Sequence, residues 1–150
     1  MTAAVQGSVP HPDGGNRFMP HILIVDDEPG TSWALAEGLT DDGHTIDTFA
    51  SAEEAWAWLQ KSQSDLVISD LRLPGMSGLD LARKLRRGRH AQPVILVTAY
   101  GTPETLREAR SLGVTDCFAK PFAMDGLRRS VTRALEASVD VRRRRTRTPR

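Results

Sequence analysis

Residues 21–30 read HILIVDDEPG, and this stretch is the clearest indication of the fold class. Its apolar run, Ile22–Val25, is followed at once by acids and then by a Pro-Gly pair. A continuous apolar run of this length, rather than an alternating one, is typical of a strand covered on both faces, as in a parallel sheet. The alternating stretch Thr45–Phe49 predicts an edge strand. Further apolar runs lie at Leu66–Ile68, Val94–Val97 and, less clearly, Val114–Ala119.

Stretches with helical features separate these runs. Ser51 and Glu54 have the spacing of a capping box. Thr102 followed by Pro103 is typical of a helix start. Gly88 is suited to a helix C-cap. The predicted helices cover residues 30–42, 51–59, 77–87, 103–112 and 123–137. A β-α order repeated five times predicts an α/β fold, with a doubly wound five-stranded parallel sheet and five helices.

Composition excludes several classes of protein. The chain has 150 residues and a net charge of +1, and its single cysteine excludes a disulfide framework. No apolar run is long enough to span a membrane, and the N-terminus lacks the features of a secretory signal, so we expect a cytoplasmic protein. We expect a disordered leader at residues 1–19, one domain at residues 20–139 and a basic, Arg-rich tail at residues 140–150.

The charge is unevenly distributed along the chain. Residues 1–75 hold 3 basic and 12 acidic side chains, which gives 3 − 12 = −9, whereas residues 76–150 hold 17 and 7, which gives +10. Six of these basic residues are arginines of the tail. A solvated extension or a continued helix is the preferred interpretation of the tail. Weak, nonspecific binding to nucleic acid or anionic lipid stays open, although no base-reading element accompanies the tail.

Polar residues follow the ends of four predicted strands. Asp26, Asp27 and Glu28 follow the first run, and Ser69 with Asp70 follows the third. Thr98 with Ala99, and Lys120 with Pro121, follow the last two. Ligands bind at the carboxyl ends of the strands in open α/β sheets, so we expect these residues to form one site.

The residue types of this site suit phosphoryl transfer. Asp26, Asp27 and Asp70 would crowd negative charge unless a cation intervened, and a hard cation with oxygen ligands, Mg²⁺, fits best. Lys120 adds a positive charge and Thr98 a hydroxyl. Such a site can position and neutralise a phosphoryl group, and a carboxylate can be its nucleophile. Asp70, alone at the end of a central strand, is the best candidate.

In these motifs, residues 21–137 resemble the receiver domain of two-component response regulators, of the CheY-like superfamily. The resemblance implies the strand order 2-1-3-4-5. It also implies a protein that catalyses only its own phosphorylation and dephosphorylation. The motifs that carry it are the acidic pair in IVDDEP, the loop SDLRLPGMSG, the strand end Val-Thr98-Ala99, and Lys120-Pro121-Phe122.

The resemblance assigns roles around Asp70. Asp70 would accept a phosphoryl group from a sensor histidine kinase or a phosphotransfer protein. Asp27 would ligate Mg²⁺ directly and Asp26 through water. Asp70 itself and the backbone carbonyl of Arg72 would complete the protein ligands.

The resemblance also assigns switch residues. Thr98, Ala99 and Lys120 would contact the phosphoryl group, and the Lys120–Pro121 peptide would be cis. The sequence departs from the family at Cys117, where an aromatic residue is usual, and we interpret Cys117 as a small apolar side chain of the interior. Tyr100 either replaces that aromatic ring or shapes the mouth of the site.

Three alternatives stay open at this point. One is a phosphatase with an Asp nucleophile, which shares this chemistry but places the nucleophile after the first strand. Another is an interaction module that works without phosphorylation. The third is a nucleic-acid binder driven by the tail. We expect a receiver with no room for an output domain. Its signal would therefore pass through an unidentified partner protein, through a homodimer or through onward phosphotransfer. The expected surface consists of the last two helices and the intervening strand.

Overall fold

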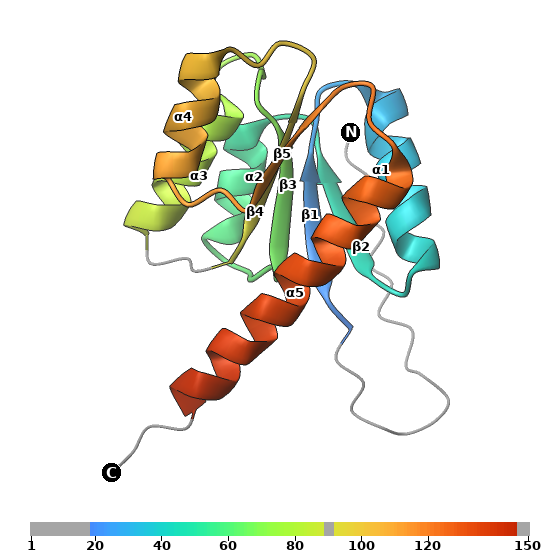
Figure 1. The fold of residues 1–150 in the computed structure, drawn as a ribbon, viewed down its shortest axis with the longest axis vertical. Coiled ribbons are helices and arrows are strands. Elements are labelled where there is room, and N and C mark those ends of the chain that lie inside the picture. Colours follow the sequence, from blue (N-terminus) through green and yellow to red (C-terminus); the bar gives the residue numbers. More distant parts are fainter. Residues whose placement is uncertain (1–18, 89–91, 147–150) are drawn as a thin grey trace.

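The computed structural model describes residues 19–88 and 92–146, in which strands and helices alternate (Figure 1). The predicted leader therefore lies outside the described residues except for its last residue, Met19. The strands are β1 His21–Val25, β2 Thr45–Phe49, β3 Leu66–Asp70, β4 Val94–Thr98 and β5 Asp116–Ala119. The helices are α1 Pro29–Asp41, α2 Ala52–Leu59, α3 Gly78–Arg87, α4 Pro103–Ser111 and α5 Met124–Thr146.

The five strands form one parallel sheet in the order β2-β1-β3-β4-β5, which confirms both the fold class and the strand order. The predicted edge strand, β2, lies at one edge of the sheet. The central strands β1 and β3 are in register, with Val25 opposite Ser69. The next residue of each strand is an aspartate, so the register places Asp26 and Asp70 side by side at the carboxyl edge.

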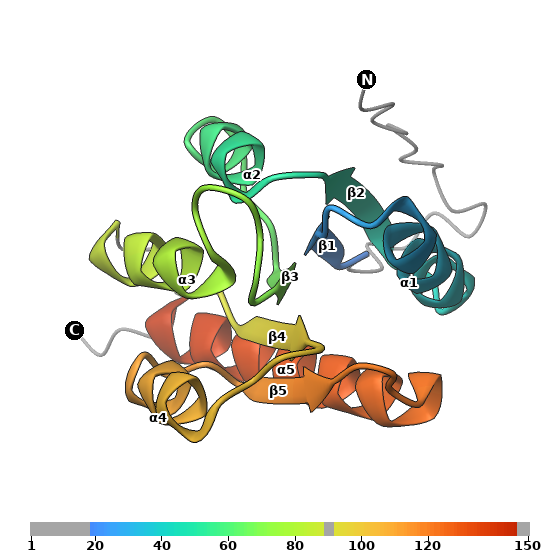
Figure 2. The same ribbon diagram turned by 90° about the horizontal axis from the view of Figure 1, so that it is seen from above.

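Helices cover both faces of the sheet (Figure 2). Successive side chains of a strand point to opposite faces, and β1 divides its apolar residues accordingly. Leu23 and Val25 belong to a buried cluster with residues of α2, α3 and α4. Ile22 and Ile24 belong to a second cluster with residues of α1 and α5. The continuous apolar run in β1 thus reflects burial on both sides, as the sequence predicted.

Three differences from the sequence predictions concern the start of β5, the capping of α2 and the end of α5, and the other element ends agree to within two residues. β5 begins at Asp116, because Gly113 adopts a positive φ of 73° and the chain enters the strand only after this turn. At α2, Ser51 accepts a hydrogen bond from the Glu54 amide, but the reciprocal bond of a capping box is not recorded among the described residues. α5 continues past the expected end at residue 137 to Thr146.

The continuation of α5 has a plain cause in the sequence. Between Ala137 and Thr146 the chain holds neither glycine nor proline. Arginine is a good helix former, and positive charge near a helix C-terminus is favourable to the helix dipole. Part of the predicted tail is therefore helical. Within residues 19–88 and 92–146, no helix combines the length and the apolar composition that crossing a membrane requires.

Candidate functional site

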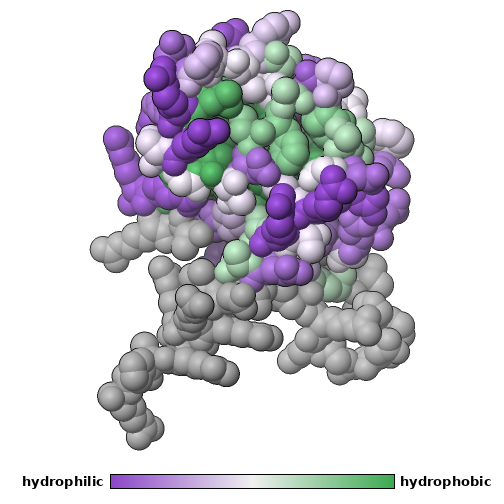
Figure 3. Space-filling view, viewed as in Figure 1, coloured by the Kyte–Doolittle hydropathy of each residue, from purple (hydrophilic) through white to green (hydrophobic). Residues whose placement is uncertain are grey.

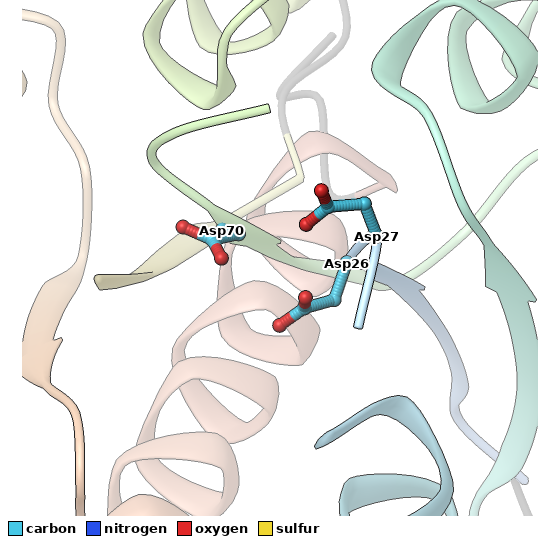
Figure 4. Close-up of side chains that lie close together, drawn as sticks. All are labelled: Asp26, Asp27 and Asp70. Atoms are coloured by element: carbon cyan, nitrogen blue, oxygen red, sulfur yellow. The ribbon is translucent and has the colours of Figure 1, made fainter. Parts of the chain in front are cut away.

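The carboxyl edge of the sheet gathers three carboxylates (Figure 4). Asp26 and Asp27 directly follow β1, and Asp70 is the last residue of β3. One carboxylate oxygen from each residue lies within 4.8 Å of the others. Asp26 and Asp70 are buried, whereas Asp27 is exposed. The two neighbouring central strands therefore place the predicted acidic residues together, with one of them open to solvent.

Lys120 bridges the two buried carboxylates. Its Nζ donates to Oδ2 of Asp70 at 2.8 Å and to Oδ2 of Asp26 at 2.9 Å. Burial by itself lowers the pKa of Lys120, but the hydrogen bonds to Asp70 and Asp26 outweigh this effect, so the pKa is raised. Burial raises the pKa of Asp26, and the bonds from the Glu28 amide and Lys120 oppose part of that rise.

Backbone amides fix the orientation of both buried carboxylates. The Arg72 amide donates to Oδ1 of Asp70 at 3.0 Å, and the Glu28 amide donates to Oδ1 of Asp26 at 2.9 Å. Each aspartate therefore uses one oxygen for a local backbone bond and the other for Lys120. The site is preorganised, because neither carboxylate has to rotate to meet its partner.

The residues present fit a divalent cation. One ammonium group pairs with two of the three carboxylates, so the three acids of the cluster outnumber its one base. Carboxylate oxygens are the ligands that Mg²⁺ prefers, and Mg²⁺ keeps several waters that an open side of the site can supply. The exposed Asp27 provides that open side. Asp26, Asp27 and Asp70 are thus the residues that could hold the ion.

Thr98 and the peptide after Lys120 complete this edge. Thr98 is 3% exposed, and its Oγ1 accepts a hydrogen bond from the Tyr100 amide at 3.1 Å. The Lys120 amide donates to the Thr98 carbonyl at 2.9 Å, which joins the ends of β4 and β5. The Lys120–Pro121 peptide is cis. Ala99 is exposed.

Cys117 and Tyr100 lie in different environments. Cys117 is half-buried against the cluster that includes α4 residues, and burial, with Asp116 beside it, raises the pKa of its thiol. Tyr100 is 69% exposed, and the guanidinium of Arg72 lies 5.6 Å from its ring centre. The Tyr100 ring therefore lies at the surface beside Arg72. It does not take the place of the aromatic ring that is usual at the position of Cys117.

The sequence did not single out Glu53, which contacts the chain that follows Asp70. Its Oε1 accepts a hydrogen bond from the Met76 amide at 3.1 Å, across 23 residues. No local pattern links the two residues. The Pro74-Gly75 pair predicts a turn, but only the packing of α2 beside that turn makes the contact visible.

Comparison with known proteins relates this chain to one family. A family model of the response regulator receiver domain matches residues 22–132. DctD of Rhizobium meliloti, the C4-dicarboxylate transport transcriptional regulatory protein, is 41% identical over 117 residues, which are 78% of this chain and 25% of DctD. Sporulation initiation phosphotransferase F of Bacillus subtilis is 34% identical over 114 residues, which are 76% of this chain and 92% of that protein.

Solved structures agree with this relationship. The chemotaxis protein CheY4 of Vibrio cholerae superposes with a TM-score of 0.73 at 30% identity, over 79% of this chain and all of CheY4. A CheY-like receiver domain protein of Methanospirillum hungatei gives a TM-score of 0.78 at 25% identity, over 82% of this chain and 98% of that one. The chain spans less than half of some curated relatives, such as 42% of TcrA of Mycobacterium tuberculosis.

Proposed function

Because this chain belongs to the response regulator receiver domain family and thus to two-component signalling, we propose that Asp70 accepts a phosphoryl group in a Mg²⁺-dependent reaction. The donor is a histidine kinase or a phosphotransfer protein. The observation that carries the proposal is the arrangement of Asp70, with Lys120 on one oxygen and two further carboxylates within 4.8 Å. Residues 20–139 form the receiver unit, and a cytoplasmic location stays a prediction.

The chemistry requires little of the protein beyond position and charge. A carboxylate oxygen of Asp70 attacks phosphorus, the phosphorus–nitrogen bond of the donor histidine breaks, and its electron pair returns to the imidazole. Lys120 already contacts Asp70 and stays close enough to pair with the transferred group. The Thr98 hydroxyl accepts from a backbone amide, so its own proton is available for a phosphoryl oxygen. Bound Mg²⁺ supplies neutralisation of the charge on the phosphoryl oxygens.

Phosphorylation of Asp70 would change the partners of Lys120 and Thr98, and so bias the surface formed by α4, β5 and α5. Leu106 of α4 and Tyr100 before it are large apolar side chains exposed to solvent. Apolar side chains gather on the face seen in Figure 3, between α4 and α1, where Figure 1 shows β5 and its connection to α5. We propose this region as the contact for a partner protein or a second copy of the chain.

Intact-mass measurement tests the phosphoacceptor directly. The protein is incubated with Mg²⁺ and acetyl phosphate, and we expect one added phosphoryl group in the wild type. Asp70→Asn should lose the adduct, whereas Asp41→Asn, which changes an exposed aspartate at the end of α1, should retain it. An adduct of unchanged yield in Asp70→Asn would overturn the assignment.

A further inference from the structure

Residues 71–77, which join β3 to α3, form a loop whose two ends are fixed. We call this segment the β3–α3 loop. At its start, the Arg72 amide bonds to the Asp70 side chain, and the Gly78 amide donates to the Leu71 carbonyl at 3.0 Å. At its end, Ser77 and Asp80 form a complete capping box for α3. The ends are therefore held by α3 and by the site itself.

The middle of the β3–α3 loop rests on a different element. Glu53 lies in the first turn of α2, and its two carboxylate oxygens face two consecutive residues of the loop. Oε1 accepts the Met76 amide at 3.1 Å. A Cβ atom on Gly75 would lie 2.5 Å from Oε2, and Gly75 has a φ of 78°, a conformation that favours glycine. Glu53 thus contacts the loop where its backbone turns most sharply.

The contact also has electrostatic support. A carboxylate near the N-terminus of a helix interacts favourably with the helix dipole, so the place of Glu53 in the first turn is favourable to α2 as well as to the loop. A charged acceptor makes a stronger bond to a backbone amide than a neutral one. The contact joins segments that are far apart in the sequence, so it constrains the loop relative to α2 and not only relative to itself.

We infer that Glu53 is a positioning residue for the phosphoacceptor site. It holds the middle of the β3–α3 loop and thereby keeps Arg72, four residues before Met76, in the place where its carbonyl would serve the metal. Leu71 and Leu73, which flank Arg72, are buried in the same apolar cluster as residues of α2, so α2 contacts the loop on both sides of its turn, through this cluster and through Glu53. This inference rests on the proposed function, but the contact itself is testable without it.

The experiment compares Glu53→Ala and Glu53→Gln with Glu54→Ala. Glu54 is the matched control, because it occupies the same helical turn and its side chain has no recorded bond to the loop among the described residues. Amide hydrogen exchange at Met76, followed by NMR, reports the contact. Mg²⁺ titration, followed by the shifts of loop amides, reports the site. The phosphorylation rate with acetyl phosphate as a function of Mg²⁺ concentration reports the chemistry.

We expect Glu53→Ala to speed exchange at Met76 and to raise the Mg²⁺ concentration for half-saturation by about three- to ten-fold, because only part of the free energy of this hydrogen bond is coupled to metal binding. Glu53→Gln, which keeps an acceptor oxygen, should recover most of both losses, and Glu54→Ala should match the wild type. Unchanged exchange in Glu53→Ala would overturn the contact, and faster exchange with unchanged half-saturation would overturn the positioning role. Failure of the wild type to gain a phosphoryl group would instead count against the proposed function, and exchange and metal binding would still decide the role of Glu53.

Discussion

The Nζ atom of Lys120 lies 2.8 Å from Oδ2 of Asp70, although the two residues are 50 positions apart and β4 separates their strands in the sheet. The same ammonium group contacts Asp26 at 2.9 Å. One positive charge therefore pairs with two buried carboxylates, Asp26 just after β1 and Asp70 at the end of β3. We therefore expect Mg²⁺ binding at this site to change the stability of the fold.

Replacement of Lys120 by methionine should make the stability of the protein depend strongly on Mg²⁺. Without the ammonium group, Asp26 and Asp70 face each other uncompensated, and we expect a loss of about 3 to 5 kcal/mol in metal-free buffer, because breaking a buried ion pair strands a charge. Saturating Mg²⁺ should recover much of this loss. Urea unfolding with EDTA and with MgCl₂ measures both values. Lys61→Met, at an exposed position, is the control, and an equal loss in the two buffers would contradict the link.

Replacement of Asp27 by asparagine should remove the effect of Mg²⁺ without harming the metal-free fold. Asp27 is exposed, so its loss leaves no buried group without a partner, and the metal-free unfolding free energy should change by less than about 0.5 kcal/mol. A ligand at 100 times its Kd stabilises the folded state by about 2.7 kcal/mol. The wild type should gain stabilisation of this kind as Mg²⁺ rises, and the variant should gain little. Thermal unfolding across a MgCl₂ series gives the comparison, and equal gains would remove Asp27 from the ligand set.

Much of the fold is predictable because local patterns agree with the tertiary structure. The continuous apolar run Ile22–Val25 by itself indicates a strand that is covered on both faces. Thr102 with Pro103 marks the start of α4. The prediction ended α5 at residue 137 and left a continued helix open for the tail, and the structure continues α5 to Thr146, where neither glycine nor proline interrupts it. The start of β5 was predicted too early, because Val114 is apolar but precedes the strand.

The candidate site divides in the same way. Asp26, Asp70 and Lys120 were predictable, because each ends or follows a strand and parallel strands share one carboxyl edge. The contacts that orient them were not. The bond from Met76 to Glu53 depends on how α2 packs beside a turn, and the proximity of Arg72 to Tyr100 depends on two loops that no periodicity describes.

If Asp70 is the phosphoacceptor, as proposed, replacement of Tyr100 by alanine should shorten the lifetime of its phosphoryl group. The guanidinium of Arg72 lies over the exposed Tyr100 ring, and an exposed contact of this kind is worth about 0.5 to 1 kcal/mol. The pair spans the β3–α3 loop and the segment after β4, so its loss should open the site to water and speed hydrolysis by about two- to five-fold. Loss of the phosphorylated mass with time, after removal of the donor, measures the rate.

A double variant tests whether Arg72 and Tyr100 limit the access of water to the site together or separately. If Arg72 and Tyr100 act together, Arg72→Ala combined with Tyr100→Ala should hydrolyse no faster than the faster of the single variants. Rates that multiply in the double variant would show that the contact does not matter. Leu106→Ala, at an exposed apolar residue of α4, serves as the control for loss of surface area.

Replacement of His44 by leucine should reduce the loss of stability at mildly acid pH. Burial lowers the pKa of His44 below 6.5, and the negative charge of Asp42 opposes only part of this effect. The Nδ1 atom of His44 is buried and has no hydrogen-bond partner among the described residues. Charging this ring in the folded state is therefore unfavourable, and the neutral form is the one that the fold accommodates.

The sign of the pH effect follows from this difference. Below pH 6.5 the unfolded chain binds a proton at His44 before the folded chain does, so stability falls as the pH decreases toward the folded-state pKa. One proton limits this contribution to about 1.4 kcal/mol per pH unit. At pH 8 the two proteins should be of similar stability, or the leucine variant slightly more stable, because an unpaired buried nitrogen is removed. Urea unfolding from pH 8 to 5.5 should show a growing advantage of the leucine variant, and parallel curves for the two proteins would show that His44 is not the titrating group.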